Sequence, residues 1–202
     1  LECLFALSAG IQTSEYLRMR SAMNAHGLWS WAIQRQDIPN PLAQKFFDRL
    51  FTENAFSALL WARVIALISL GFYGANLVNV TFLFVSNLTV LIRWRGAFNG
   101  GSDFMTLVVL TGLLIAQWLT FFDAPELGWR ACFWYITIQS MTSYFVSGAV
   151  KLLRPEWRNG SAMTIFLNAA IHGPLQQTHL LRKPWLATLG SWSFILWECA
   201  AP

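Results

Sequence analysis

The chain has 202 residues, of which 55% are hydrophobic, 15% aromatic and only 12% charged, and its mean hydropathy is +0.45. Soluble domains carry about 25% charged residues, so this composition excludes an ordinary soluble domain and predicts an integral membrane protein. The formal net charge of +4 is modest, and the sequence contains no phosphate-binding loop, serine-hydrolase motif or nucleic-acid-binding motif.

Apolar segments long enough to cross a bilayer recur along the chain. Residues 1–17 form an incomplete one, which we expect to be the end of a first spanning helix. Further spans are predicted at residues 55–73, 77–94, 104–122, 128–153 and from 185 onward. The connection at residues 74–76 is so short that its two flanking helices must form an antiparallel hairpin. We therefore predict an all-α, polytopic membrane helix bundle of about six transmembrane helices, a single domain over residues 1–202 that is truncated at both ends.

Two connecting stretches are aromatic and polar instead of continuously apolar. In the first, residues 27–31 and 46–51 resemble short amphipathic pieces that lie at the membrane interface. In the second, only about eleven residues, 161–171, are apolar, which is too few to cross. We expect an interfacial or re-entrant helix there. Eleven tryptophans agree with this interpretation, because indole rings prefer the boundary between membrane and water.

Lysine and arginine are distributed unevenly between the predicted loops. Loops 18–54, 93–103 and 154–183 alternate on one side of the membrane and contain five, two and four basic residues. The loops on the other side contain only Arg130. The positive-inside rule therefore predicts that the first three loops are cytoplasmic, and we expect the protein to lie in a bacterial inner membrane with the lipid bilayer and other membrane subunits as partners.

Lys151, at the end of the fifth predicted span, is the main candidate for chemistry. Steps of four residues back from it reach Ser147, Ser143 and Gln139, so these polar side chains share one helix face. An amine removed from water loses its proton more readily and can act as a general base. The alternative is structural: a lysine at the end of a span often extends to the headgroups, and serines often pack helices together.

The turn at residues 98–103 is predicted to lie on the same side as residues 151–160, with a helix N-cap at Ser102 or Asp103. The two segments could therefore bring acceptors and a carboxylate to Lys151. The candidate site consists of Lys151 as base, with Asn99, Ser102, Asp103, Glu156 and Trp157 as neighbours. In the alternative interpretation, residues 100–101 merely form a tight turn and Glu156 merely starts a helix after a proline.

Two more charges fall inside predicted spans, Arg63 in the second and Glu198 in the sixth. An unpaired charge at the centre of a bilayer costs roughly 2.5 to 3.5 kcal/mol or more. Two alternatives follow: the two residues pair with each other, or each meets a phosphate, water or a missing partner.

The cysteines and histidines carry no metal-site pattern. Cys3, Cys132 and Cys199 are scattered, and each is expected to be a buried, inert thiol. The histidines are in predicted connections, and no pair has the helical spacing of metal or haem ligands; they are His26, His172 and His179. We therefore predict no metal site, and no cofactor is evident.

Three motifs stand out: Asn-Gly-Gly-Ser-Asp at residues 99–103, Tyr-Phe-Val-Ser-Gly-Ala-Val-Lys-Leu-Leu at 144–153 and Glu-Trp-Arg-Asn-Gly-Ser-Ala-Met at 156–163. Together they resemble the horizontally transferred transmembrane (HTTM) domain, the membrane part of vitamin K-dependent gamma-carboxylases. Residues 120–124 also resemble the end of the corresponding carboxylase helix. The similarity is best over residues 93–163 and implies an HTTM-like helical fold.

The resemblance leaves two functions open. In the carboxylases, the lysine that matches Lys151 is the proposed base that deprotonates reduced vitamin K. Lys151 would then be the general base of a carboxylase-related membrane enzyme acting on a quinol-like or other lipophilic substrate, with reduced vitamin K or another quinol as cofactor. The carboxylase pattern, however, has a histidine where this chain has Gly101. That departure favours a non-catalytic HTTM-like subunit, which packs against partner proteins in a larger membrane complex.

Overall fold

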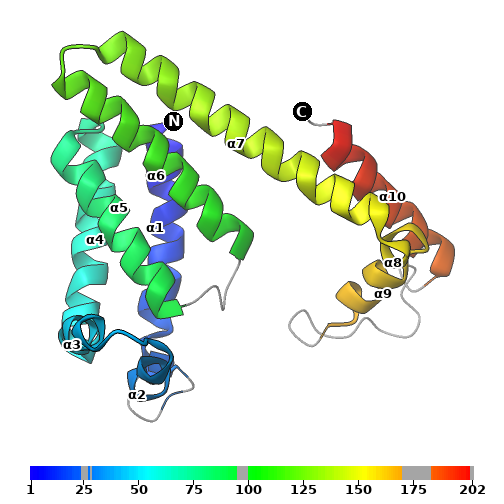
Figure 1. Cartoon of the computed structure of the whole chain (residues 1–202), viewed down its shortest axis with the longest axis horizontal. Helices are drawn as coiled ribbons and strands as arrows, with labels where there is room; N and C mark the ends of the chain where they lie inside the picture. The colour runs from blue at the N-terminus through cyan, green and yellow to red at the C-terminus, as the bar shows by residue number, and fades with distance from the viewer. Residues whose placement is uncertain (24–26, 28, 95–99, 170–182, 201–202) are drawn as a thin grey trace. The chain divides into compact units, whose positions relative to one another are not determined.

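The structure, a computed structural model, describes residues 1–23, 27, 29–94, 100–169 and 183–200. Every regular element within these ranges is a helix, as the composition predicts (Figure 1). The chain, predicted above as one domain, divides into two compact units, Leu1–Ile136 and Thr137–Pro202. Helix α7 (Pro125–Leu153) contributes residues to both units.

The first unit is built from long apolar helices. Besides the first part of α7, they are α1 (Glu2–Arg18), α4 (Glu53–Tyr73), α5 (Leu77–Trp94) and α6 (Gly100–Phe121). Helix α4 packs between α1 and α5, and α5 packs against α6 (Figure 1). Apolar side chains from all four helices form the core; among its fully buried members are Leu67, Leu70, Leu83, Leu110 and Leu113. Burial of these side chains holds the helices together.

Three of the described helices are long and apolar enough to cross a membrane: Glu53–Tyr73, Leu77–Trp94 and, within α6, Asp103–Phe121. They match the predicted spans at residues 55–73, 77–94 and 104–122. The other predicted spans are also helical, but α1 and α10 (Pro184–Ala200) have only 17 residues each. Helix α7 has 29 residues, yet its middle carries polar side chains that lower its hydropathy, including Gln139 and Ser143.

The predicted hairpin between α4 and α5 is confirmed. Helix α4 ends at Gly74, whose φ of 79° lies in the left-handed region that glycine adopts without strain. Two side chains then secure the turn: Glu2 Oε1 accepts from the Ala75 N–H at 3.0 Å, and Asn76 Oδ1 accepts from the Asn79 N–H at 2.9 Å. The first of these bonds ties the start of α1 to the turn.

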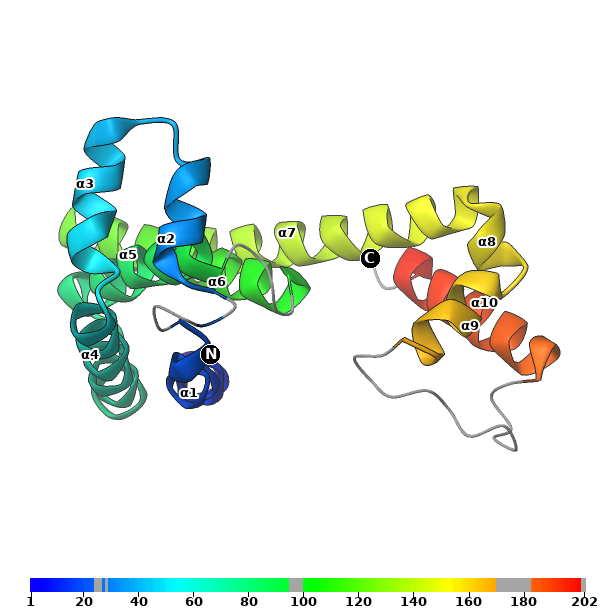
Figure 2. The same ribbon diagram turned by 90° about the horizontal axis from the view of Figure 1, so that it is seen from below.

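Short helices connect α1 to α4. They are the 3-10 helix Arg20–Met23, α2 (Trp31–Gln34), the 3-10 helix Arg35–Asp37 and α3 (Pro41–Leu50). Asn40 caps α3, because its Oδ1 accepts from the Leu42 N–H at 2.9 Å and Pro41 occupies the first helical position. Helices α2 and α3 lie side by side (Figure 2), with the rings of Trp31 and Phe47 in edge-to-face contact.

Asp48 joins the same two helices. Its Oδ1 accepts from Arg35 Nε and from Trp31 Nε1, both at 2.8 Å. These hydrogen bonds, that of Arg35 first, hold the pKa of the Asp48 carboxyl below its ordinary value. Helix α3 also has a polar, basic face with Lys45 and Arg49 exposed, as predicted for residues 46–51; its position at the membrane interface stays a prediction.

The second unit consists of the rest of α7 followed by α8 (Pro155–Arg158), α9 (Ser161–Leu167) and α10. Helices α8 and α9 both pack against α10 (Figure 2). The predicted interfacial helix over 161–171 does begin at Ser161, but α9 ends after seven residues. Residues 170–182 lie outside the described residues.

Candidate functional site

The second unit contains a polar cluster centred on Lys151, which we call the Lys151 cluster: Ser147, Lys151, Trp157 and Glu198. Lys151 Nζ donates to both carboxylate oxygens of Glu198, at 2.6 Å for Oε2, and to Ser147 Oγ at 3.1 Å. The Lys151 and Glu198 side chains are 19% and 12% exposed. This is a partly buried, charge-assisted contact, the stronger kind of hydrogen bond.

Three helices supply the cluster. Helix α7 places Ser147 one turn before Lys151, and α10 brings Glu198 from 47 residues further along the chain. From α8, the ring of Trp157 lies with its centroid 5.0 Å from Lys151 Nζ, within the range of a cation–π contact. An ammonium has three N–H donors, and here its nitrogen lies within hydrogen-bond distance of three oxygens from two residues.

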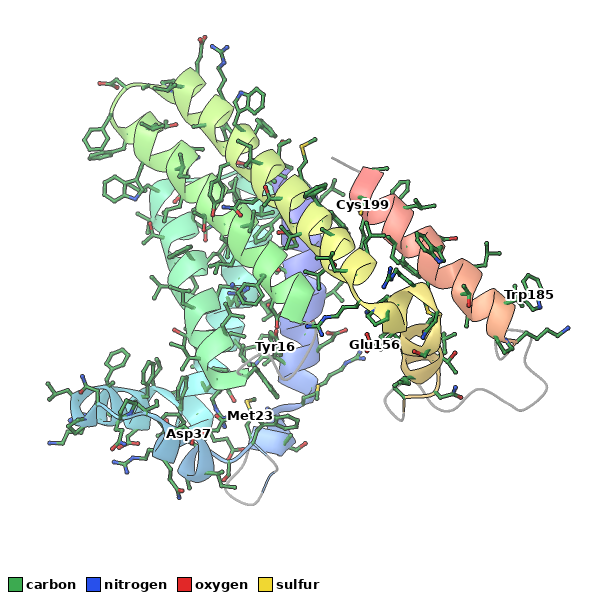
Figure 3. All side chains as sticks on the ribbon, turned by 45° about the vertical axis from the view of Figure 1, so that its right-hand side comes forward. Tyr16, Met23, Asp37, Glu156, Trp185 and Cys199 are labelled. Atoms are coloured by element: carbon green, nitrogen blue, oxygen red, sulfur yellow. The ribbon has the colours of Figure 1, made fainter. Side chains whose placement is uncertain are left out.

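Gly148 explains how α7 and α10 come close enough for this contact. A Cβ at Gly148 would lie 2.8 Å from Cys199 Sγ, 2.9 Å from the Cys199 nitrogen and 3.0 Å from Glu198 Cβ. These distances are shorter than van der Waals contacts, so only glycine allows this approach. Figure 3 labels Cys199, which lies near the C-terminal end of α10.

The turn after α8 is also fitted to α10. Gly160 has a φ of 79°, and a Cβ there would lie 2.7 Å from the backbone nitrogen of Thr188. Thr188 Oγ1 donates to the Asn159 carbonyl at 3.1 Å, and Trp192 Nε1 donates to the Arg158 carbonyl at 3.1 Å. The motifs at 144–153 and 156–163 therefore both contribute close contacts to α10 in this unit.

The first unit has a polar centre of its own at Arg63, which is 0% exposed. Its guanidinium donates to Thr13 Oγ1 at 3.1 Å, the Leu83 carbonyl at 3.3 Å, Ser86 Oγ at 3.0 Å and Asn87 Oδ1 at 2.8 Å. All of these acceptors are neutral. Neither alternative given above for Arg63 and Glu198 describes these contacts, because Arg63 binds acceptors of its own chain and Glu198 contacts Lys151.

The predicted neighbours of Lys151 have different surroundings. The structure brings Trp157 to the amine. Glu156, labelled in Figure 3, is exposed at the start of α8, and its carbonyl accepts from Ser161 Oγ at 3.2 Å. The carboxylate that contacts Lys151 belongs to Glu198 instead. Along the predicted polar stripe, Ser147 contacts Lys151, whereas Ser143 and Gln139 are exposed.

The other predicted neighbours of Lys151 either belong to the first unit or are not among the residues that the structure describes. Asp103 is buried, and its Oδ1 accepts from Tyr16 Oη at 3.2 Å and from Gln12 Nε2; Figure 3 labels Tyr16. Asn99 lies outside the described residues, and the side chain of Ser102 is likewise not described. The predicted cap at Ser102 or Asp103 is wrong, because α6 already begins at Gly100 and includes both residues.

The thiols follow the prediction only in part. Cys132 is buried and Cys199 is half-buried, but Cys3 is exposed, with Sγ 3.4 Å from the Gly71 carbonyl that accepts its hydrogen bond. The prediction of burial was wrong for Cys3, because it lies in the open depression between α1 and α4, although its thiol reaches the Gly71 carbonyl. All three histidines fall outside the described ranges. Within those ranges, no group of three or more His, Cys, Asp or Glu residues is arranged to hold a metal ion.

The geometry of the Lys151 cluster suits two chemical roles. It can cross-link α7 to α10 through opposite charges, and it can hold a proton at Lys151 Nζ beside a carboxylate. Comparison with known protein families, curated proteins and solved structures finds no match. The choice between the roles therefore rests on the contacts themselves.

Glu198 is the site residue whose role the sequence alone did not reveal. The available signal was its charge within an apolar segment, which requires a compensating partner. Lys151 was the basic residue at the end of another apolar segment, and Gly148, three residues before it, was the sign of a close helix contact. Together these features could have suggested the pair.

Proposed function

We propose that this chain is a non-catalytic integral membrane subunit with an HTTM-like fold of about six transmembrane helices, which packs against partner proteins in a larger membrane complex. The observation that carries the proposal is that the Lys151 amine is already bound by residues of its own cluster. A general base must offer a nitrogen lone pair to the proton that it accepts. Here the Lys151 ammonium is already engaged by the Glu198 carboxylate and by Ser147 Oγ, and the Trp157 ring lies beside it.

The outer face of α7 supports the existence of a partner. Gln139 and Ser143, four residues apart, share one face of α7 and are exposed on it. A polar side chain that faces hydrocarbon is unfavourable, whereas a neighbouring helix can hydrogen-bond to it. A partner helix on this face would form a hydrogen bond with Gln139.

The remaining features of the proposal come from charge and hydropathy. Helices α1, α7 and α10 would span the bilayer together with α4, α5 and α6. The positive-inside rule supports cytoplasmic loops at 18–54, 93–103 and 154–183, and a bacterial inner membrane is the proposed location.

Purification in a mild detergent should yield a stoichiometric complex, whose members are identified by mass spectrometry. Gln139→Leu should reduce the recovery of partner several-fold, because an interhelical hydrogen bond in a membrane contributes about 0.6 to 1.7 kcal/mol. Thr81→Leu is the matched control: Thr81 is also exposed, but its hydroxyl already donates to the Leu77 carbonyl at 2.6 Å. Recovery of a lone monomer from mild detergent would contradict the proposal.

A second candidate function is a gamma-carboxylase-related enzyme that acts on a quinol-like or other lipophilic substrate, with Lys151 as general base and reduced vitamin K or another quinol as cofactor. Two observations favour it. The Glu198 carboxylate is placed to take a proton from Lys151 Nζ, which would free the nitrogen lone pair. The Lys151 side chain also keeps 19% of its surface exposed, so the amine is not sealed from a substrate.

The enzyme function is tested with Lys151→Ala. Loss of a general base typically lowers a rate by about 10²- to 10⁴-fold, so quinol oxidation by membranes containing this variant should fall by that factor. Lys45→Ala, at an exposed lysine of α3, is the control and should leave the rate unchanged. Full quinol oxidation by Lys151→Ala, or none by the unaltered protein, would rule out this second candidate.

A further inference from the structure

Helix α3 lies across the direction of the long helices of the first unit. Helices α1 and α4 run lengthwise in Figure 1 and are seen nearly end-on in Figure 2, whereas α3 is end-on in Figure 1 and lengthwise in Figure 2. Helix α3 ends at Leu50, and α4 begins three residues later, at Glu53. Because α4 is long and apolar enough to span the bilayer, a helix that crosses it at its start lies along the membrane surface.

One face of α3 is turned away from the rest of the first unit. The exposed side chains of this helix recur at spacings of three and four residues and therefore share that face: Leu42, Lys45, Phe46 and Arg49. The two apolar members are 74% and 63% exposed. Asp48, on another face, binds α3 to the short helices before it. The exposed face is thus held in place while its own side chains stay open.

A hollow of about 600 Å³ lies between this face and the start of α4, within the range of roughly 300 to 1,000 Å³ that is typical of ligand pockets. Its lining is made of two cations and three apolar residues: Lys45, Phe46, Arg49, Leu50 and Ala55. Within the described residues, neither cation forms an ion pair. The lining therefore has a net charge of +2 beside an apolar wall.

The spacing of the two cations suits a phosphate. Lys45 and Arg49 are one helical turn apart, and like charges at that spacing destabilise a helix. An anion bound by both would remove this repulsion. A guanidinium can donate two parallel hydrogen bonds to phosphate oxygens, and an ammonium can donate to the same group. Glu53, exposed at the start of α4, does not line the hollow and leaves this charge in place.

We propose that the hollow binds an anionic phospholipid, with the phosphate between Lys45 and Arg49 and the start of an acyl chain against Phe46 and Leu50. The depth agrees with this, because Ala55 in the lining is also the first residue of the predicted span 55–73. The headgroup would then lie where the hydrocarbon of the bilayer begins.

The predicted topology supports an anionic lipid as the occupant. Helix α3 belongs to the loop 18–54, the most basic of the loops that the positive-inside rule places in the cytoplasm. The cytoplasmic leaflet carries anionic lipids, whose negative surface potential attracts basic segments. The hollow belongs to the first unit and shares no residue with the Lys151 cluster. It requires a bilayer but no partner protein, so its test is independent of the one for the subunit.

A second hollow of similar size has the opposite charge. It measures about 470 Å³ and lies at the turn between α6 and α7. Its charged lining residues are Asp123, Glu126 and Arg130, which give a net charge of −1. A phosphate is repelled there, although an arginine is present. The two hollows therefore form a matched pair for experiments.

The test is native mass spectrometry of the purified full chain in a nonionic detergent, titrated with phosphatidylglycerol or phosphatidylcholine. Phosphatidylglycerol should bind more tightly. Lys45→Gln and Arg49→Gln should each weaken its binding about fivefold, and the double variant about 25-fold, since each basic residue near a membrane surface contributes about a factor of five. Phosphatidylcholine, whose choline cation opposes the charge of the site, should respond less.

Two controls separate the charge from other effects of substitution. Lys45→Arg keeps the charge and should retain the preference for phosphatidylglycerol. Arg130→Gln makes the same charge change in the second hollow and should have no effect. Lys45 and Arg49 are exposed, so the fold accommodates these substitutions, and thermal unfolding of each variant verifies that it is folded.

Phe46→Ala tests the acyl-chain half of the proposal. It removes the largest apolar side chain of the lining and should weaken the binding of both lipids. Phe121→Ala is the matched control, because Phe121 is 65% exposed, close to the 63% of Phe46, but lies at the end of α6 and outside the hollow.

Three results would overturn the proposal. Equal affinities for the two lipids, unaffected by the double variant, would remove the basic pair from the site. Displacement of phosphatidylglycerol by soluble glycerol 3-phosphate would show that a free phosphate compound, and not a lipid, is the ligand. A copurifying protein that the double variant releases, with phosphatidylglycerol binding unchanged, would assign this face to a protein partner.

Discussion

Glu198→Gln is expected to destabilise the second unit by about 2 kcal/mol. The substitution leaves the ammonium of Lys151 without its counter-charge in a partly buried site. Removal of one partner from a fully buried ion pair costs roughly 3 to 5 kcal/mol. The value here is lower because the Lys151 and Glu198 side chains are 19% and 12% exposed, so that solvent can screen the remaining charge. The measurement is thermal or denaturant unfolding of the purified protein in detergent.

The double variant Lys151→Met/Glu198→Leu should recover most of this loss, because it removes both charges and leaves apolar side chains of similar size. Glu156→Gln, which neutralises an exposed carboxylate of α8, is the control and should change stability by less than about 0.5 kcal/mol. If the double variant were as unstable as Glu198→Gln, the charge pair would not be the source of the loss. Normal assembly of the stable double variant with the proposed partner proteins would support a purely structural cluster.

Arg63→Met should destabilise the first unit by about 3 kcal/mol. Arg63 is fully buried, and three of its four acceptors lie on α5: the Leu83 carbonyl, Ser86 Oγ and Asn87 Oδ1. Ser86 Oγ also donates to the Leu83 carbonyl and so keeps one bond. The Asn87 side-chain oxygen loses its hydrogen bond from Arg63, and each buried polar group left without a partner costs about 1 to 3 kcal/mol.

Asn87→Leu combined with Arg63→Met should restore part of the stability, because it removes the orphaned amide. Arg35→Met is the matched control: Arg35 pairs with Asp48, but its side chain is 44% exposed, and a surface ion pair contributes about 0 to 1 kcal/mol. Unfolding midpoints in detergent compare the three variants. Similar losses for Arg63→Met and Arg35→Met would contradict the importance of the buried network.

The helices of this protein were easier to predict from the sequence than the contacts between them. Spans at α4, α5 and α6 are long and almost free of charge, and hydropathy alone indicates their length. Their boundaries also follow from local signals such as Gly74, which ends α4. In α7, polar side chains such as Gln139 interrupt the apolar pattern. The sequence therefore predicted the helix correctly, but the hydropathy of α7 is too low to identify it as a membrane span.

The site was harder because helical periodicity tells which residues share a face but not which helix meets that face. The stripe from Gln139 to Lys151 was visible, yet the carboxylate came from α10 and not from the segments at Asp103 or Glu156. The close contact with α10 depends on Gly148; a glycine in the sequence indicates that a helix can approach there, but not which helix does. The partners of Arg63 could not be predicted either, because the sequence does not show which helices face it.

The Arg63 contacts also bear on how the protein enters a membrane. Alone in hydrocarbon, the arginine of α4 would cost roughly 2.5 to 3.5 kcal/mol or more. Most of its acceptors are in α5, which follows after the short turn at Gly74. The free energy of transferring α4 and α5 together as a hairpin is therefore lower than the sum for two separate transfers. The turn of only three residues, 74–76, keeps the two helices next to each other, so they can enter the membrane as one unit.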